Sequence, residues 1–411
     1  MNKSSKLVSL VTSLLVIMFL LNFPVYAKTV EKKQMLRSNS SVMVMSHRGD
    51  ESLFPSNSLE AVLSAYQNEG ADMVSVSIRK TSDDVLVVCD DMPLYNICET
   101  DKTDISDYTY DEIKNLKLYR YNGEVSDFNI PKLETLIETA ADEFILVIDN
   151  AWEFRDEIYE ICGRLNKIES VMLRTDESSK QVTKWIDSKG EKPMDVIGIY
   201  DGNIIFNAIS HIDRFSKANQ PAVQYQSKNY FNVMYGSLLT DRFSNRLNSR
   251  AIAPMYDKDL CGQRSDNANG WDEMISKGFT VIETNNVKEL KKHLKQCSES
   301  MEKLSGLVNE VKDTNLEQYS QVSAKNFSAA LKNAQDIVHS DFASLNETQE
   351  RMSVLIQAIN NLTFNKGNDL QKGNINITAG KIIAVVVFGA LILAGEIYVH
   401  KMHKPKKGKK H

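Results

Sequence analysis

The residues best suited to chemistry lie directly after an apolar run near the start of the chain. His47 and Arg48 follow the strand candidate Val42–Ser46. An imidazole takes up or releases a proton near neutral pH, and a guanidinium can bind two phosphate oxygens at once. At the end of a strand, this pair therefore favours a site for an anionic group such as a phosphate.

Four further residues bear on whether a metal ion joins this site. Ser75 and Ser77 are two residues apart on one strand candidate, so their side chains face the same side. Asp90 follows an apolar segment, and Asp149 ends another strand candidate. A calcium or magnesium ion needs several oxygen ligands, mostly carboxylates. Ser75 and Ser77 carry neutral hydroxyls, so Asp90 and Asp149 supply the carboxylates among these four residues.

Eight apolar strand candidates, most of them followed by a helical pattern, fill the middle of the chain. They are Val42–Ser46, Met73–Arg79, Phe144–Asp149, Ser170–Arg174, Asp195–Ile199, Ala222–Gln226, Ala251–Met255 and Phe279–Glu283. Several are continuous apolar runs, as expected for parallel strands covered on both faces. Eight strand–helix units in about 250 residues match the size of a (β/α)8 TIM barrel. We therefore predict an α/β fold with a barrel over residues 42–297, and a doubly wound open sheet is the alternative.

Helical spacing between the strands supports this architecture. Leu59, Val62, Leu63 and Tyr66 recur at i, i+3, i+4 and i+7 after the expected N-cap Ser58. A polar, tyrosine-rich insertion over residues 94–130 interrupts the second strand–helix unit. We expect the insertion to leave the barrel at the end where functional loops are built.

Taken in order, these segments resemble the glycerophosphodiester phosphodiesterase family. The resemblance rests on His47-Arg48-Gly49, Gly70-Ala71-Asp72, Thr81-Ser82-Asp83, Ile130-Pro131-Lys132-Leu133 and the segment 278–285. Each segment is weak alone, but their order and spacing together are specific.

The exchanged positions are those at which the family does its chemistry. Family members have an acid at Ser56, a Glu-x-Asp pair at Ser75 and Ser77, and a second histidine at Asp90. The resemblance implies that the pair binds a divalent cation and that two histidines act as general base and general acid. Here His47 is the only retained family histidine, and Asp90 stands in place of the second. Losing one such group typically lowers the rate by about 10²–10⁴.

The resemblance therefore implies a degenerate phosphoric diester hydrolase. We expect His47 and Arg48 to bind a phosphodiester or glycerol-phosphate group, as a small molecule or a polymer. Because the family's metal-binding positions carry Ser75 and Ser77 here, the resemblance implies no metal or other cofactor, with Asp149 as a residual acid. Metal-dependent hydrolysis is expected to be lost or much weakened. Asp149 lies one residue from the acid that the family carries on its third strand, and we expect this shift to change the direction in which it faces.

Two alternatives stay open from the sequence. The first is an active hydrolase that holds calcium or magnesium in a rebuilt site. Its candidate ligands are the acids near the barrel mouth: Asp83, Asp84, Asp90, Asp91 and Asp149. The second is a surface scaffold for protein–protein interaction, in which the barrel does no chemistry.

The segment after the barrel differs in character. Three apolar stripes at helical spacing run from Leu304 to Val311, from Phe327 to Ala334 and from Met352 to Ile359. No strand signal separates them, so residues 301–363 are predicted to form a three-helix module. The module resembles the FIVAR modules of bacterial surface proteins, which are spacers or binding modules.

Both ends of the chain indicate a cell-surface protein. Residues 1–27 have the basic start, apolar run and small-x-small end of a signal peptide, and residues 28–41 form a flexible lead-in. A linker over residues 364–377 precedes an apolar stretch, 378–400, which is long enough to span a bilayer. The basic tail 401–411 is expected to stay in the cytoplasm. We therefore predict a single-pass cell-membrane protein with its barrel outside.

Charge and cysteine content exclude other classes. The net charge is −5, and no basic stripe interleaved with aromatic residues is present, so we expect no nucleic-acid partner. The five cysteines show no metal-ligand spacing. We interpret them as buried thiols, and a Cys89–Cys98 disulfide is the alternative in a secreted chain.

Overall fold

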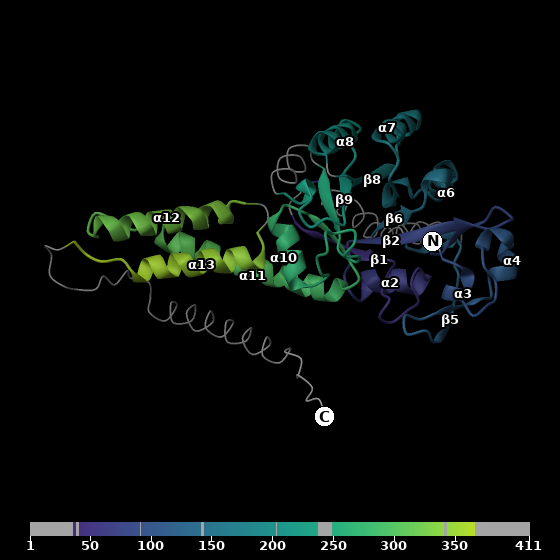
Figure 1. Cartoon of the computed structure of the whole chain (residues 1–411), viewed down its shortest axis with the longest axis horizontal. Helices are drawn as coiled ribbons and strands as arrows, with labels where there is room; N and C mark the ends of the chain where they lie inside the picture. The colour runs from purple at the N-terminus through teal and green to yellow at the C-terminus, as the bar shows by residue number, and fades with distance from the viewer. Residues whose placement is uncertain are drawn as a thin grey trace, which may run out of the picture. The chain divides into compact units, whose positions relative to one another are not determined.

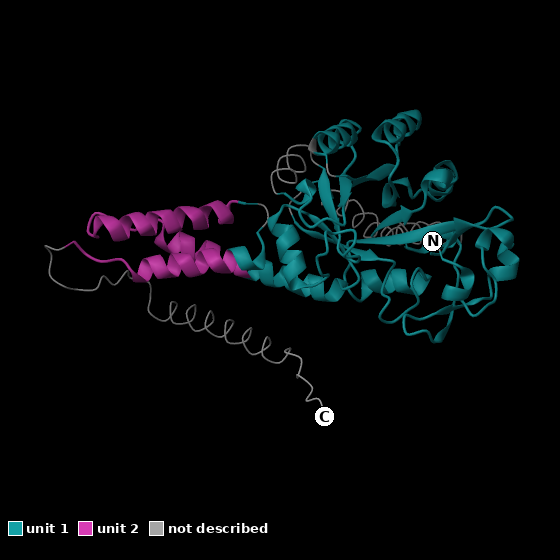
Figure 2. Cartoon of the chain, viewed as in Figure 1, with its two compact units in different colours: residues 1–299, 340–347 teal, residues 300–339, 348–411 magenta. Residues whose placement is uncertain are grey.

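A computed structural model describes residues 36–37, 41–90, 92–140, 144–202, 204–236, 249–340 and 343–365. The chain divides into two units (Figure 2). Unit 1 comprises residues 1–299 and 340–347, and unit 2 comprises residues 300–339 and 348–411. Each unit is described by itself.

Unit 1 is built around a closed ring of eight parallel strands. In ring order they are β1 (Met43–His47), β2 (Met73–Lys80), β6 (Ile145–Asp149), β7 (Val171–Thr175), β8 (Asp195–Asp201), β9 (Ala222–Gln226), β10 (Arg250–Pro254) and β11 (Val281–Thr284). β1 pairs with both β2 and β11, which closes the ring. All eight predicted strands are confirmed, and the closing pair makes the open-sheet alternative wrong.

Amphipathic helices cover the outside of the ring (Figure 1). They are α2 (Leu59–Gln67), α5 (Leu133–Ala140), α6 (Arg155–Leu165), α7 (Ser179–Ser188), α8 (Ile205–Lys217), α10 (Ala268–Ser276) and the first turns of α11 (Val287–Val311). The expected N-cap of α2 is confirmed, because Ser58 Oγ accepts a hydrogen bond from Ala61 N at 3.1 Å. The main apolar core lies between these helices and the strands.

Side chains inside the ring form layers, because successive residues of each strand point alternately into and out of the barrel. Alternate residues point inward, so the inward set of β1 is Met43, Met45 and His47. The lower positions are apolar and buried: Leu36, Met43, Met45, Met73, Ile145, Val147, Met172, Ile197, Ala222, Ile252 and Val281. The next inward positions, at the carboxyl ends of the strands, are mainly polar. The alternation therefore places a polar layer directly above an apolar one.

The insertion after β2 has its own small core. β3 (Leu86–Val88) pairs antiparallel with β2, and β4 (Lys117–Tyr119) pairs with β5 (Val125–Asn129). The short helices α3 (Leu94–Ile97), η1 (Ile105–Asp107) and α4 (Tyr110–Ile113) complete it. All five cysteines of the chain are free and buried, so the alternative Cys89–Cys98 disulfide is not formed.

Unit 2 consists of packed helices. Its helical parts are the end of α11, α12 (Gln321–Val338) and most of α13 (Leu345–Asn360), and their apolar core includes Leu304, Phe327 and Leu355. α11 is one continuous helix, so the predicted break between residues 297 and 301 falls inside it.

The predicted signal peptide, most of the lead-in and linker, the membrane span and the basic tail lie outside the described residues. Within the described ranges, no helix combines the length and the apolar composition required to cross a bilayer.

Candidate functional site

The carboxyl ends of the barrel strands surround a cavity of about 700 Å³. Its wall includes His47 and Arg48 from the end of the first strand, and Arg174, Gln224 and Tyr256 from later parts of the barrel. The predicted ligand-binding pair therefore does face a cavity at the barrel mouth. Two polar networks organise this cavity.

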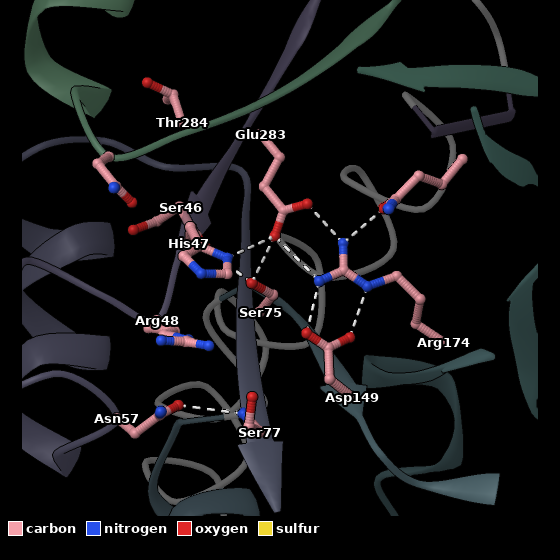
Figure 3. A network of polar contacts seen from close by, with 12 residues as sticks. Ser46, His47, Arg48, Asn57, Ser75, Ser77, Asp149, Arg174, Glu283 and Thr284 are labelled. Carbon is pink, nitrogen blue, oxygen red and sulfur yellow. Dashed lines mark hydrogen bonds and ion pairs between the residues drawn. The ribbon is translucent and has the colours of Figure 1, made fainter. Parts of the chain in front are cut away.

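The first network is centred on Arg174, which lies near the carboxyl end of β7 with its side chain inside the barrel (Figure 3). Its Nε and Nη2 donate to the two carboxylate oxygens of Asp149, both at 2.5 Å. Nη1 and Nη2 donate to Glu283 Oε2 and Oε1 at 2.5 and 3.0 Å. The remaining N–H of Nη1 donates to Gln224 Oε1 at 2.7 Å. A guanidinium has five N–H donors, and here protein acceptors engage all of them.

Glu283 extends this network to the first two strands. It accepts a hydrogen bond from Ser75 Oγ at 2.7 Å, and its Oε1 lies 3.1 Å from His47 Nδ1. Burial alone raises the pKa of the Glu283 carboxyl, but Arg174 and His47 outweigh burial and lower this pKa to about 2. Glu283 is therefore a permanent anion inside the barrel.

The ring of His47 is fixed on two sides. One face stacks on Tyr256, with ring centroids 3.5 Å apart and the planes 6° from parallel. The edge carrying Nδ1 meets Glu283. When Nδ1 carries the proton toward this carboxylate, Nε2 is left as the acceptor, as in a general base oriented by an acid.

The second network holds Arg48. Its guanidinium lies against Asp90, with Nε 3.0 Å from Oδ1 and Nη1 3.1 Å from Oδ2. Asn57 Nδ2 donates to Asp90 Oδ1 at 2.6 Å, and Asn57 Oδ1 accepts from Ser77 N at 3.1 Å. Burial raises the pKa of Asp90, and Arg48 opposes this rise without cancelling it. Asp90 therefore contacts Arg48, the residue that we predicted to bind the ligand.

Gly49 explains why the motif ends in glycine. Its φ is +93°, and a Cβ atom at this position would lie 2.5 Å from the backbone carbon of Ala61 in α2. Only glycine allows the loop after His47 and Arg48 to approach the helix this closely.

The residues at the mouth do not provide a ready site for a divalent cation. Ser75 and Ser77 are neutral, and Ser75 Oγ already donates to Glu283. The two inward carboxylates, Asp149 and Glu283, are both bound by Arg174. A calcium or magnesium ion placed there would have to displace a fully hydrogen-bonded guanidinium.

The side chain of Asp149 faces in a direction other than the one that we expected. It pairs in parallel register with Ser77, and Val147 pairs with Ser75, so Asp149 faces the barrel interior as the serines do. The predicted change of facing is wrong, because β6 is in register with β2 and keeps this acid on the inward set.

The acids proposed as ligands of a rebuilt metal site either have other partners or lie outside the described residues. Asp83 accepts from Thr81 and from Tyr110 N, and Asp84 pairs with Lys80. Asp91 lies outside the described residues. Asp90 and Asp149 are each bound by an arginine.

Within the described ranges, one group of three side chains could bind a metal ion by their type and proximity. It consists of Asp272, His293 and Cys297. Asp272 accepts from His293 at 2.7 Å and from the backbone N–H groups of Leu345 and Asn346. Its oxygens thus already have donors, and hydrogen bonding accounts for the group.

Sequence reasoning missed Arg174, Gln224, Tyr256 and Glu283. Arg174 and Glu283 each end a predicted strand, two positions beyond an inward apolar residue. Extending the period-2 alternation by one step would have placed both in the mouth.

Comparisons with known proteins agree with this architecture. Residues 47–187 match the model of the Glycerophosphoryl diester phosphodiesterase family. A comparison with curated proteins gives no match. This part of the barrel is therefore similar in sequence to that family.

Solved structures are similar in fold. A proposed glycerophosphoryl diester phosphodiesterase from Silicibacter pomeroyi DSS-3 has a TM-score of 0.50 at 13% identity, covering 63% of this chain and 94% of that one. A glycerophosphoryl diester phosphodiesterase from Parabacteroides distasonis ATCC 8503 has a TM-score of 0.49 at 18% identity, covering 61% and 85%. The first likeness supports the barrel fold.

Proposed function

We propose that the barrel mouth binds a phosphodiester or glycerol-phosphate group and that metal-dependent hydrolysis is lost or much weakened. The observation that carries this proposal is the capture of both inward carboxylates by Arg174. Carboxylates bound in this way are poor ligands for a cation. They also repel an incoming anion less, because the guanidinium offsets part of their charge.

His47 and Arg48 supply the attraction for the ligand. Both line the cavity, and the Arg48 side chain is 32% exposed, in contrast to 3% for Arg174. Arg48 is therefore the arginine with donors to offer to a phosphate. The family match over residues 47–187 favours a phosphodiester as the natural ligand class.

We also propose that the chain is held at the outer face of the cell membrane by residues 378–400, with unit 2 as a FIVAR-like spacer. This part of the proposal rests on the apolar stretch and basic tail of the sequence. The test is fractionation of cells that express either the full chain or a chain lacking residues 378–411. Truncation should release the protein from the membrane.

Calorimetry tests the binding proposal. The full chain is titrated with glycerophosphocholine and with sn-glycerol 3-phosphate, in EDTA and in calcium. We expect one site per chain with at least one of the ligands, unchanged by EDTA, and at least about tenfold weaker binding in Arg48→Ala, or about 1.4 kcal/mol.

Arg164→Ala is the matched control, because Arg164 pairs with Glu134 on the outer helices, away from the cavity. It should bind as the natural chain does. Absence of binding, or binding unaltered in Arg48→Ala, contradicts the proposal.

Residual hydrolysis is the second candidate, and the fixed ring of His47 favours it. A general base held by Glu283 and Tyr256 is oriented even without a metal. Release of choline from glycerophosphocholine is measured in EDTA and in several divalent cations. Turnover that His47→Ala abolishes would establish this second function.

A further inference from the structure

Two carboxylates inside the barrel share one atom of one cation. Asp149 Oδ2 and Glu283 Oε1 lie 2.5 and 3.0 Å from the same atom, Arg174 Nη2. They come from β6 and β11, on different sides of the ring, and the Arg174 side chain is only 3% exposed. Protein oxygens bind calcium at about 2.3–2.6 Å. A cation at the Nη2 position would therefore reach both carboxylates with small movements.

The surrounding residues add neutral oxygen atoms. Ser75 Oγ lies 2.7 Å from Glu283 Oε1, and Gln224 Oε1 lies 2.7 Å from Arg174 Nη1. Hydroxyl and amide oxygens are acceptable ligands for calcium beside carboxylates. Without the guanidinium, the pocket would hold two carboxylates, a hydroxyl beside Glu283 and the amide oxygen that Arg174 Nη1 now contacts.

We propose that the Arg174 guanidinium takes the place of a resident divalent cation in this barrel, and that Asp149 and Glu283 form a latent cation site that it fills. Cation binding is measured here without any phosphodiester. A negative result for the cation therefore leaves the proposed binding of a phosphodiester untouched, and the reverse also holds.

The test is cation binding to the full chain. Calcium and manganese are titrated separately into the natural chain and Arg174→Ala, by calorimetry and by the electron paramagnetic resonance of free manganese. We expect no stoichiometric binding by the natural chain. Arg174→Ala should bind one ion per chain, at least about tenfold more tightly than the natural chain.

Second substitutions locate the ion. Asp149→Asn in the Arg174→Ala background should abolish binding, because it removes one of two carboxylates. Glu153→Gln in the same background is the matched control, since Glu153 lines the cavity and is not a partner of Arg174. It should leave binding intact.

A folding check keeps the test decisive. Arg174→Gln retains polar hydrogen-bonding capacity, and both variants are prepared with and without calcium. A latent site predicts that calcium raises their melting temperatures. The proposal is overturned if the natural chain binds one ion through Asp149, if both variants fold but bind none, or if neither folds even with calcium.

Discussion

Arg174 and Glu283 face each other across the barrel and are joined by two hydrogen bonds, Nη1–Oε2 at 2.5 Å and Nη2–Oε1 at 3.0 Å. Their strands, β7 and β11, are four steps apart in either direction around the closed ring. The pair therefore joins opposite walls of the barrel. With Asp149 it forms a buried ion network at the level where a ligand would enter.

Removing the centre of this network should destabilise the barrel. Arg174→Met leaves Asp149 and Glu283 buried without their cation, and breaking a buried pair in this way costs about 3–5 kcal/mol. The measurement is urea unfolding in EDTA, followed by tryptophan fluorescence. All three tryptophans, at positions 152, 185 and 271, lie in unit 1.

The triple variant Arg174→Met, Asp149→Asn, Glu283→Gln is the control for this experiment. It removes the charges together, so most of the lost stability should return. If Arg174→Met unfolds at the same urea concentration as the natural chain, the network does not stabilise the fold.

Asp90→Asn should strengthen binding of an anionic ligand. The carboxylate now neutralises Arg48 at 3.0 Å, and an amide of similar size leaves the full charge of Arg48 for the ligand. We expect severalfold tighter binding of sn-glycerol 3-phosphate at low salt, and a smaller gain at high salt because exposed charges are screened.

Asp104→Asn is the matched control, since Asp104 pairs with Arg79 at 2.8 Å and neither residue lines the cavity. It should leave affinity unchanged. Weaker binding in Asp90→Asn would instead mean that Asp90 mainly positions Arg48.

Alkaline pH should destabilise unit 1 through His293. Burial lowers the pKa of His293, but its hydrogen bonds to Asp272 and Cys297 outweigh burial and raise this pKa to about 9, from an ordinary 6.5. The resulting stability, up to about 3 kcal/mol, is fully present below pH 6.5 and is lost as pH rises through 9. Melting temperatures from pH 6 to 10 should fall more in the natural chain than in His293→Gln.

His211 provides the opposite case for comparison. Burial, aided by Arg214, lowers the pKa of His211 to about 4. Its effect appears on the acid side, where stability is lost as pH falls from 6.5 toward 4. Substituting His211 should change the acid limb of the profile and leave the alkaline limb as it was. An unchanged alkaline limb in His293→Gln would contradict the assignment.

Gly49→Ala should be far more damaging than Gly70→Ala. Both glycines have positive φ, +93° and +80°, so each substitution carries a backbone cost of about 1–2 kcal/mol. Only at Gly49 does the new Cβ meet backbone, at 2.5 Å from Ala61, whereas nothing lies within 4 Å at Gly70. Chemical denaturation of both variants gives the comparison, and equal losses would refute the argument from close approach.

The strands were predictable because their physical signal is local. Parallel strands covered on both faces are continuous apolar runs, and all eight are present in the chain in the expected order. The ring order then follows from sequential pairing. The helix α2 was equally predictable, because its apolar spacing and its Ser58 cap lie within a few residues of each other.

The candidate site was predictable only in part, because its partners are remote in sequence. His47 and Arg48 could be placed from one local segment. The bond from Arg174 to Glu283 spans 109 positions, and that from His47 to Glu283 spans 236. Local patterns place each residue on its strand but do not reveal which charged side chains meet inside the ring. The prediction of the side on which Asp149 faces failed for a related reason, because that side depends on the register between β6 and β2.

The apolar layer beneath the charged residues has a consequence for how such a protein can change over generations. Met43, Met45, Met73 and Met172 belong to that layer, and methionine is unbranched and adapts its shape to irregular space. Changes of side-chain size one level higher can therefore be accommodated by small rearrangements of these methionines. A barrel of this kind can therefore change the chemistry of its mouth when charged partners are exchanged together, while the layer beneath keeps the ring closed.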